Sequence, residues 1–387
     1  MNIDLKTAVM LLLITHIVQI VIFYQQYVTN KYLKEIKWWL FWSIAEVAAF
    51  LFIFLRGVPE LHTLVIVGQN TAMALGTLFL YIGTLRFFGK RENVKVITIF
   101  MLFFVLICIY FTGIDENLIV RSIFINLYMS VFSILTALVL IRNKLSAHRS
   151  TFYILTFSFL LNGIIFGFRG VVIASGLYDV TNFFSPDPLN VLTYISGIIV
   201  SILWTFGYIV LINQRVNEEF KEQMVQYSNL ANSSTALIWT SGTDKLCNYF
   251  NEPWLKFTGR TLEQEMGNGW AEGVHPDDFD RCVKTYVTAF DNQEKFEMEY
   301  RLKNAKGEYR WIIDMGTPNY NSKNEFTGYI GHCFDITDRK NDEAEVNRKV
   351  KELKELNDLM IDRELKMVEL KKEINQLTKE SGKPEKY

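Results

Sequence analysis

Seven long apolar runs, separated by short polar stretches, fill the first 215 residues of the 387-residue chain. The hydrocarbon core of a bilayer is about 30 Å thick, so a helix needs about 20 apolar residues to cross it. Backbone groups exposed to lipid would lose their hydrogen bonds, and each run is therefore expected to be helical throughout. Residues 1–215 are thus predicted to form an α-helical seven-transmembrane bundle in the lipid bilayer. The predicted spans are residues 7–28, 38–55, 64–88, 96–112, 119–141, 152–175 and 190–212.

The pattern changes after the seventh run. In residues 216–230 apolar residues still recur at helical spacing, which predicts a connecting helix. Further along, a turn at 303–307 separates two runs of alternating apolar and polar residues, a pattern typical of a β-hairpin with one buried face. A last strand is predicted over residues 326–334. The hairpin residues expected to face inward are Phe296, Met298, Tyr300 and Leu302 on one strand, and Tyr309, Trp311 and Ile313 on the other.

Residues 339–380 lack glycine and proline and are rich in Glu, Lys and Leu. Of eight positions on a heptad seam, seven are apolar, which predicts a coiled coil. Arg363 interrupts the seam and is expected to influence its register. The alternative is a solvated single helix, which is marginally stable without a partner at this polarity. The seam positions are Leu353, Leu356, Met360, Arg363, Met367, Leu370, Ile374 and Leu377. A short tail, 381–387, follows.

Charge divides the chain at the same place as hydropathy. Residues 1–215 carry 15 Lys and Arg against 9 Asp and Glu, whereas residues 216–387 carry 25 against 32. The near-neutral total gives no indication of nucleic-acid binding, and no nucleic-acid partner is predicted. An apolar, basic half joined to an acidic, charged half indicates a membrane module with a soluble extension.

Basic residues also predict the orientation of the bundle. Twelve lie in alternate loops or just after the seventh span, against three at the other helix ends. Loops rich in Lys and Arg stay in the cytoplasm, so the N-terminus is expected outside and residues 216–387 inside. The twelve are Lys31, Lys34, Lys37, Arg86, Lys90, Arg91, Lys95, Arg142, Lys144, Arg149, Arg215 and Lys221, and the three are Lys6, Arg56 and Arg121.

Several polar side chains lie within the predicted spans or at their ends. Ionisable groups in a bilayer are costly and often functional, so these are candidates for a ligand or signalling role. The alternative is a structural role, as hydrogen bonds between helices or as arginines that reach the membrane surface. Glu46 and Arg169 lie deepest and are a possible pair. The candidates are Glu46, Arg56, Asn70, Arg121, Asn162 and Arg169.

Two segments of the membrane half resemble a known module. They are Leu55-Arg56-Gly57-Val58-Pro59 and Ile202-Leu203-Trp204-Thr205-Phe206-Gly207-Tyr208. These segments resemble the seven-helix sensory region that precedes PAS, histidine kinase or diguanylate cyclase domains in bacterial receptors. The resemblance covers residues 1–215 and implies a protein of the inner (plasma) membrane.

Residues 228–338 contain a series of motifs. They are Asn251, Trp254, Thr258-Gly259-Arg260, Gly267, Trp270, His275-Pro276-Asp277-Asp278, Glu297, Glu299-Tyr300-Arg301, Gly307-Glu308-Tyr309-Arg310-Trp311, Gly328-Tyr329-Ile330-Gly331 and Asp335-Ile336-Thr337. In order and spacing this series resembles a PAS domain with its C-terminal PAC motif. The resemblance implies a five-stranded antiparallel sheet with helices on one face. It also implies that the joint Asp335-Ile336-Thr337 transmits strain to the exit helix, although helix capping alone would explain these residues.

Three tryptophans, Trp254, Trp270 and Trp311, are candidates to line a ligand cavity in this domain, and the alternative is ordinary core packing. His275 is better explained as a helix start than as a metal or haem ligand. The flavin-binding members of the family carry a cysteine in a run like Asn-Cys-Arg-Phe-Leu-Gln, which is absent here. Without CxxC spacing or a haem-type pattern, no metal and no cofactor are predicted, and a small-molecule ligand would be of unknown kind.

No enzyme signature is found in the soluble half. Residues 339–387 contain no histidine to accept a phosphoryl group, and the chain lacks a glycine-rich ATP-binding region and a cyclase motif. Two hypotheses remain. The first is a sensor that acts through a downstream signalling protein, as a homodimer formed through the PAS domain and coiled coil. The second is the input half of a sensor histidine kinase whose catalytic domains are lost or separately encoded. A transporter with a regulatory PAS domain is a weaker third reading.

Overall fold

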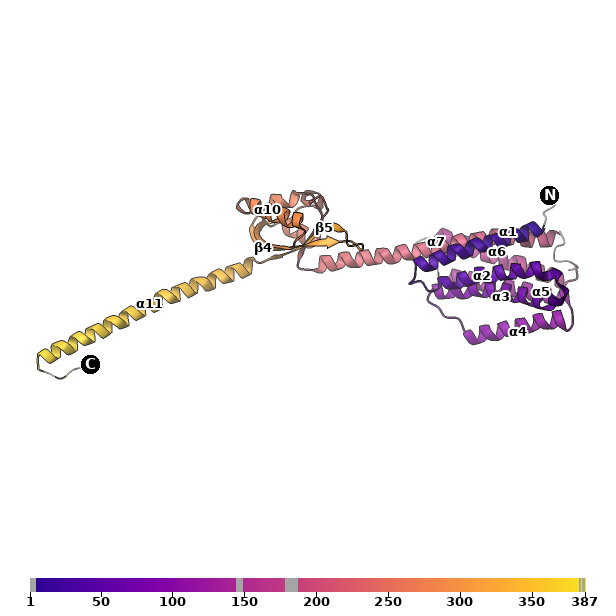
Figure 1. Cartoon of the computed structure of the whole chain (residues 1–387), viewed down its shortest axis with the longest axis horizontal. Coiled ribbons are helices and arrows are strands. Elements are labelled where there is room, and N and C mark those ends of the chain that lie inside the picture. The colour runs from indigo at the N-terminus through magenta and orange to yellow at the C-terminus, as the bar shows by residue number, and fades with distance from the viewer. Residues whose placement is uncertain (1–4, 144–148, 178–186, 383, 385–386) are drawn as a thin grey trace. The chain divides into compact units, whose positions relative to one another are not determined.

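The computed structural model describes residues 5–143, 149–177, 187–382, 384 and 387 (Figure 1). The chain divides into two compact units, Met1–Glu218 and Glu219–Tyr387. Among the predicted loop charges, Lys144 lies outside the described residues, as do residues 383, 385 and 386 of the predicted tail. Nothing is described of the Arg149 side chain.

The first unit consists of long helices. Within the described residues, seven are long and apolar enough to cross a membrane, as the hydropathy pattern predicts. The last of them extends to Ser233, so it contains the whole of the predicted connecting helix 216–230. The helices are α1 (Leu5–Thr29), α2 (Ile36–Phe54), α3 (His62–Phe87), α4 (Val94–Gly113), α5 (Leu118–Arg142), α6 (Arg149–Ala174) and α7 (Pro188–Ser233). The 3-10 turns η1 (Leu55–Gly57) and η2 (Pro59–Leu61) join α2 to α3.

Small residues on α3 allow α2 to pack closely against it. A Cβ atom at Gly83 would lie 2.6 Å from Nε1 of Trp39, and one at Gly76 would lie 2.7 Å from Oε1 of Glu46. Trp39 is itself fixed by stacking on Tyr208 of α7, with ring centroids 4.2 Å apart. Close approach at glycines is a common basis of helix association in membranes, where the hydrophobic effect between helices is absent.

The second unit contains the predicted five-stranded antiparallel sheet, in the order β2-β1-β5-β4-β3. Its strands are β1 (Leu237–Ser241), β2 (Cys247–Phe250), β3 (Phe296–Lys303), β4 (Tyr309–Tyr320) and β5 (Phe326–Asp335). Four short elements connect β2 to β3 and cover one face, namely α8 (Glu252–Thr258), α9 (Leu262–Glu265), η3 (Gly269–Gly273) and α10 (Pro276–Asn292). The core between them and the sheet is rich in aromatic side chains.

The expectation for the inward face is correct on β3 and wrong on β4. On β3, Phe296, Met298, Tyr300 and Leu302 are all buried. On β4, the buried side chains are Ile312 and Asp314, not Tyr309, Trp311 and Ile313.

The cause lies in the pairing of the two strands. Residues directly opposite each other in an antiparallel pair share a face of the sheet. Ile312 pairs with the buried Tyr300, whereas Trp311 pairs with Arg301 on the outer face. The run Trp311-Ile312-Ile313 is apolar on both faces, so alternation alone does not determine its register.

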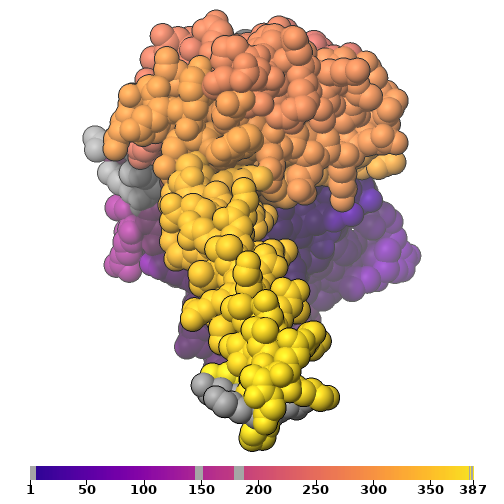
Figure 2. All heavy atoms as spheres, turned by 90° about the vertical axis from the view of Figure 1, so that its left-hand side faces the viewer, coloured from indigo at the N-terminus to yellow at the C-terminus, as the bar shows by residue number. Residues whose placement is uncertain are grey.

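The C-terminal helix α11 extends from Thr337 to Glu380, as predicted for residues 339–380. No residue of α11 is buried in the single chain, and the seam residues Leu353, Leu356, Met360, Leu370 and Leu377 are exposed. Figure 2 shows one face of α11, in yellow, with its side chains at the surface. The helix is therefore present, while its pairing remains a prediction.

Because the indole of Trp39 occupies the space beside Gly83, the substitution Gly83→Leu should destabilise the helical unit. Overpacking of a fixed contact typically costs about 1–3 kcal/mol. The expected result is a lower midpoint of thermal unfolding of the full-length protein in detergent. Gly57→Leu is the matched control, because a Cβ at Gly57 meets no atom within 4 Å. Equal midpoints for the two variants would contradict this account of the α2–α3 contact.

Candidate functional site

The joint between the sheet and α11 is fixed by backbone contacts. Oδ1 of Asp335 accepts a hydrogen bond from the N–H of Thr337 at the start of α11 (2.9 Å). Oγ1 of Thr337 accepts from the N–H of Trp311 (2.8 Å), and the N–H of Ile336 donates to the Trp311 carbonyl (2.8 Å). The predicted joint thus satisfies backbone groups near the helix start and also binds the helix to β4, so its capping and coupling roles are geometrically compatible.

An ion pair reinforces this joint. Nε of Arg310 lies 2.8 Å from Oδ2 of Asp335, and its Nη2 lies 3.4 Å from Oδ1 of Asp338 in the first turn of α11. Burial raises the pKa of Asp335, but hydrogen bonds from Thr337 and Arg310 outweigh it and hold the pKa below its ordinary value. Asp335 is therefore charged at neutral pH and remains a partner for Arg310.

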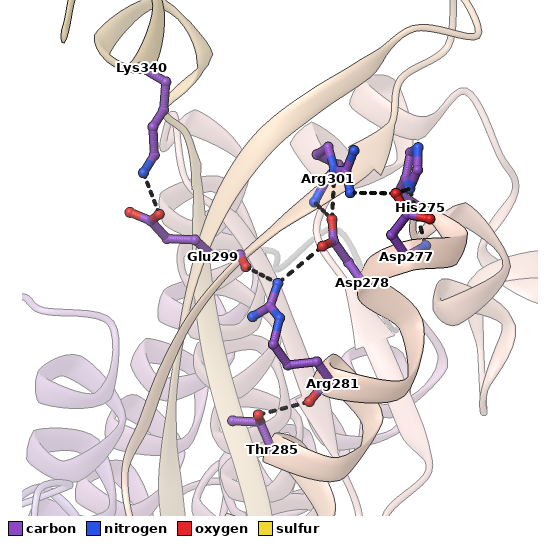
Figure 3. A network of polar contacts seen from close by, with 8 residues as sticks. All are labelled: His275, Asp277, Asp278, Arg281, Thr285, Glu299, Arg301 and Lys340. Atoms are coloured by element: carbon purple, nitrogen blue, oxygen red, sulfur yellow. Dashed lines mark hydrogen bonds and ion pairs between the residues drawn. The ribbon is translucent and has the colours of Figure 1, made fainter. Parts of the chain in front are cut away.

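The first turn of α11 also contacts the outer face of β3. Nζ of Lys340 lies 2.6 Å from Oε2 of Glu299 (Figure 3). The Trp311 ring lies between two cations, with Lys340 Nζ at 5.6 Å and Arg301 Cζ at 5.5 Å from its centroid. Trp311 is therefore not a cavity residue. It forms part of the surface that holds the exit helix.

A chain of polar contacts continues from this surface to α10, as Figure 3 shows. Arg281 donates to the carbonyl of Glu299 (2.7 Å) and lies 3.3 Å from Oδ1 of Asp278. Oδ2 of Asp278 accepts from Nε of Arg301 (2.8 Å). The hydrogen bond from Arg301 is the main reason why the pKa of Asp278 is lowered to about 2. The start of α10, the middle of β3 and the first turn of α11 therefore belong to one polar network.

His275 occupies the helix-start position that the sequence predicts. It is the N-cap of α10, and its Nδ1 accepts from the N–H of Asp277 (3.2 Å). Pro276 follows at the first helical position, where the missing N–H costs nothing. Among the described residues, no group of three or more His, Cys, Asp and Glu side chains could hold a metal ion.

The core of the domain contains a small cavity. Trp254 and Trp270 line it, together with Trp239, Tyr286, Met298, Asp314 and two others, and whether the cavity binds a ligand stays a prediction. Its volume is about 10 Å³, which is about the space of one water molecule. Any larger ligand would have to displace side chains.

Asp314 is the one carboxylate on this cavity wall and is 2% exposed. Asp314 is not among the site residues predicted from the sequence, although a charged residue in an otherwise apolar strand is a usable signal. Its Oδ1 accepts from Nε1 of Trp239 (3.1 Å). Burial raises the pKa of Asp314 to about 6, and the hydrogen bond from Trp239 opposes the rise. Burial likewise raises the pKa of the Cys333 thiol well above its ordinary value.

The polar candidates of the first unit are partly or fully buried and make local contacts. Arg56 donates to Gln69 (2.9 Å), Arg121 to Thr112 (2.9 Å), Arg169 to Asn190 (2.8 Å) and Asn162 to Ser133 (2.8 Å), and Asn70 is buried on α3. Glu46 is buried against Trp42 and Gly76. The possible pair of Glu46 with Arg169 is not present among the ion pairs of the described residues. Arg363 lies in α11, where no side chain is buried.

The pKa of Asp314 predicts how stability changes with pH. Folding raises this pKa from 3.8 to about 6, so the neutral acid is preferred in the fold. The resulting stabilisation is complete below pH 3.8 and is lost as pH rises through about 6, at a cost of about 3 kcal/mol. Denaturant unfolding of the second unit should show that Asp314→Asn reduces the loss of stability between pH 5 and about 7.5. The exposed-site control Asp280→Asn should retain the wild-type loss. If Asp314→Asn lost as much stability over this pH range as the wild type, the ionisation of Asp314 would not be the cause of the loss.

Comparison with known proteins identifies the domain. Residues 248–333 match the family model described as the PAS fold. An uncharacterized protein, y4lL of Sinorhizobium fredii, is 39% identical over 147 residues, which are 38% of this chain and 18% of that protein. The peroxide stress-activated histidine kinase mak1 of Schizosaccharomyces pombe is 28% identical over 123 residues, 30% of this chain and 8% of the kinase. The chain spans less than a fifth of the length of either relative.

Solved structures are also similar to part of the chain. One is a sensory box histidine kinase/response regulator from Burkholderia thailandensis, with 28% identity and a TM-score of 0.27 over 33% of this chain and 96% of that chain. Another is the PAS domain of a protein from Colwellia psychrerythraea, with 23% identity and a TM-score of 0.27 over 30% and 98%. The family match and the observed five-stranded antiparallel sheet together show that residues 248–333 form a PAS domain.

Proposed function

We propose that this chain is a membrane-bound sensor that detects a signal and passes it through α11 to a downstream signalling protein. In this proposal the seven-helix unit is inserted in the plasma membrane with the N-terminus outside, and the PAS domain is cytoplasmic. The observation that carries the proposal is the attachment of the first turn of α11 to the outer face of the sheet, through the pairs Arg310–Asp335 and Lys340–Glu299.

The argument for transmission starts from the geometry of this attachment. A rigid helix moves as one body when its first turn shifts, so a small change at the sheet is carried along its whole length. Thr337 and Lys340 contact β4 and β3, two adjacent strands. A shear between these strands would therefore tilt or rotate α11. The polar network extends the same influence to α10, which covers the core.

The helix α11 is proposed to pair with α11 of a second copy of the chain, and the dimer would pass the movement to the downstream signalling protein. A helix of 44 residues with no buried side chain and an apolar seam is favoured as one strand of a coiled coil. Two copies of Arg363 on one seam repel each other, which would make the dimer modest in strength and easily switched. This property suits a signalling helix whose register changes with the state of the sensor.

A second candidate is the input half of a sensor histidine kinase with separate catalytic domains. Its support is that two relatives of the PAS region are named histidine kinases. In either case the joint between the sheet and α11 would transmit the signal to the exit helix. Incubation of the purified full-length protein with labelled ATP tests whether this chain itself has kinase activity. Label on a histidine would show that the chain does more than pass a signal to a partner.

The orientation can be tested by reporter fusions after Arg215. Basic loops are retained in the cytoplasm, so a reporter that is active only in the cytoplasm should be active there. A reporter that is active only outside should be silent at this position and active when fused after Ile114, between α4 and α5. The reverse pattern would contradict the proposed insertion.

Coupling through the joint can be tested by charge reversal. Lys340→Glu places two acids together at β3 and should release the first turn of α11. Disulfide cross-linking between two copies through Leu356→Cys, measured in native membranes, should then change in extent. Lys349→Glu is the matched control, because Lys349 pairs with Glu345 within α11 and not with the sheet. Adding the reversal Glu299→Lys to Lys340→Glu should restore the wild-type extent of cross-linking. Cross-linking that stays the same in Lys340→Glu and in the double reversal would count against the proposal.

Arg363→Leu tests the seam itself. Removing the repelling pair and adding apolar contact should strengthen self-association of the full-length protein in detergent, measured by sedimentation. Arg348→Leu, a change of the same kind off the seam, should leave the association constant near its wild-type value. The seam assignment fails if Arg363→Leu leaves the association constant unchanged.

A further inference from the structure

A cleft lies where the loop between α3 and α4 meets the start of α2. Its volume is about 440 Å³, within the range of about 300–1,000 Å³ that is typical of small-molecule sites. Most of its lining residues are charged, namely Glu35, Arg86, Lys90, Arg91 and Glu92. The cleft is therefore suited to a charged ligand.

The cleft lies at the ends of three helices that are long and apolar enough to cross a membrane. Glu35 directly precedes the helix that starts at Ile36, and residues 88–93 join the helices that end at Phe87 and start at Val94. The ends of a membrane-spanning helix lie at the level of the lipid headgroups. In the proposed function this is the cytoplasmic boundary of the membrane, and the inference rests on the proposed insertion of the helical unit.

The loop that carries the basic residues has a defined shape. Gly89 has a φ of +69°, and its N–H donates to the carbonyl of Arg86 (2.9 Å). The N–H of Lys90 donates to the carbonyl of Leu85 (3.0 Å). These two hydrogen bonds are the usual ending of a helix at a glycine in the left-handed region. The chain therefore leaves α3 in a fixed direction, and Lys90 is presented at a fixed place.

Arg86 and Glu92 neutralise each other within the cleft. Nε of Arg86 donates to Oε2 of Glu92 (3.0 Å), and Nη2 donates to Oε1. The hydrogen bond from Arg86 lowers the pKa of Glu92 below its ordinary value and outweighs the opposite effect of burial. The same guanidinium lies over the ring of Trp38, with Cζ 4.6 Å from the ring centroid. The pair thus shapes the cleft and leaves its charge to the three other ionisable residues.

Those three residues make no ion pair within the described part of the chain. Lys90 and Arg91 are exposed. Glu35 is the N-cap residue of α2, yet its side chain makes no capping hydrogen bond, and its Oε2 is buried without a hydrogen-bond partner. A buried carboxylate oxygen without a donor is unfavourable. Because the last torsion of a glutamate is soft, this oxygen can turn toward a donor bound in the cleft.

This arrangement favours a ligand that carries both signs of charge. Lysine and arginine bind phosphate oxygens, arginine with paired hydrogen bonds. A carboxylate binds an ammonium group that has N–H donors, and it would repel a ligand that is wholly anionic. Basic pockets at the cytoplasmic ends of membrane helices are suited to phospholipid headgroups. A headgroup that joins a phosphate to a primary ammonium meets both requirements.

We propose that this cleft binds the headgroup of an aminophospholipid such as phosphatidylethanolamine. The phosphate binds Lys90 and Arg91, and the ammonium group donates to Glu35. A free phosphorylated amine has the same two groups. The lipid is favoured because Val94 in the cleft wall and Val96 one residue beyond Lys95 are exposed apolar residues at the start of α4, where acyl chains would contact them. A bound headgroup would join the start of α2 to the loop between α3 and α4.

The test is a thermal-unfolding titration of the full-length protein in detergent with short-chain phosphatidylethanolamine, phosphatidylglycerol and phosphatidylcholine. Phosphatidylglycerol has the phosphate without the amine, and phosphatidylcholine has a quaternary ammonium without an N–H to donate. The expected result is a saturable rise in the unfolding midpoint, with the highest apparent affinity for phosphatidylethanolamine. Equal affinity for the three lipids, or no saturable rise, would overturn the proposal.

Substitutions separate the two halves of the site. Glu35→Gln should lower the affinity for phosphatidylethanolamine about tenfold and remove its advantage over phosphatidylglycerol, because a charge-assisted hydrogen bond is lost. Arg91→Gln and Lys90→Gln should each weaken the binding of both lipids. Glu116→Gln and Arg142→Gln are the matched controls, because these exposed residues do not line the cleft, and they should leave the affinities unchanged. Wild-type selectivity in Glu35→Gln would overturn the proposal.

A second arm distinguishes the lipid from a free phosphorylated amine. Phosphoethanolamine and glycerophosphoethanolamine are titrated under the same conditions. A Glu35-dependent response that is at least tenfold weaker than that to the short-chain lipid supports a lipid ligand, because the acyl chains then contribute about 1.4 kcal/mol or more. An equal response to the soluble compounds would overturn the assignment to a lipid. Binding is measured without any signalling output and does not depend on which side of the membrane the cleft faces, so its failure leaves the topology and coupling tests independent.

Discussion

The pairing of β3 with β4 is the constraint on which the second unit depends. With Ile312 opposite Tyr300 and Asp314 opposite Met298, one face of the hairpin closes the core. The same pairing puts Trp311 opposite Arg301 on the other face. A shift of one residue would bury the charged group of Arg301 and expose Tyr300, so the register is strongly fixed by burial.

Two different environments follow from this single register. Inside, a carboxylate is held among aromatic rings with space for about one water, and burial favours its neutral form. Outside, the polar and aromatic residues of β3 and β4 form the surface on which the first turn of α11 rests. Trp311 connects the two environments, because its backbone accepts from Ile336 and donates to Thr337 while its ring contacts Lys340. A change within the core thus has a short physical route to the exit helix.

Elements were predicted correctly from the sequence where the pattern of residues within one segment decides its structure. The seven apolar runs, the alternation on β3, the start of α10 at His275-Pro276 and the long glycine-free helix all appear in the structure. The sequence did not predict features that depend on contacts between distant segments of the chain. Trp311-Ile312-Ile313 is apolar on both faces, so only its pairing with β3 shows which side is buried. The contact of Lys340 with Glu299 joins residues far apart in the chain, and no local pattern marks it.

The central claim is that α11 and the outer face of the sheet act as one mechanical unit through the Trp311–Thr337 contact. Hydrogen–deuterium exchange of the full-length protein tests it most directly, by comparison of the wild-type protein with Thr337→Val, which lacks the hydroxyl acceptor. The account predicts faster exchange both at residues 337–341 and at residues 309–312 on β4, with residues 296–300 of β3 unchanged. Faster exchange confined to α11, with β4 protected as in the wild type, would contradict it.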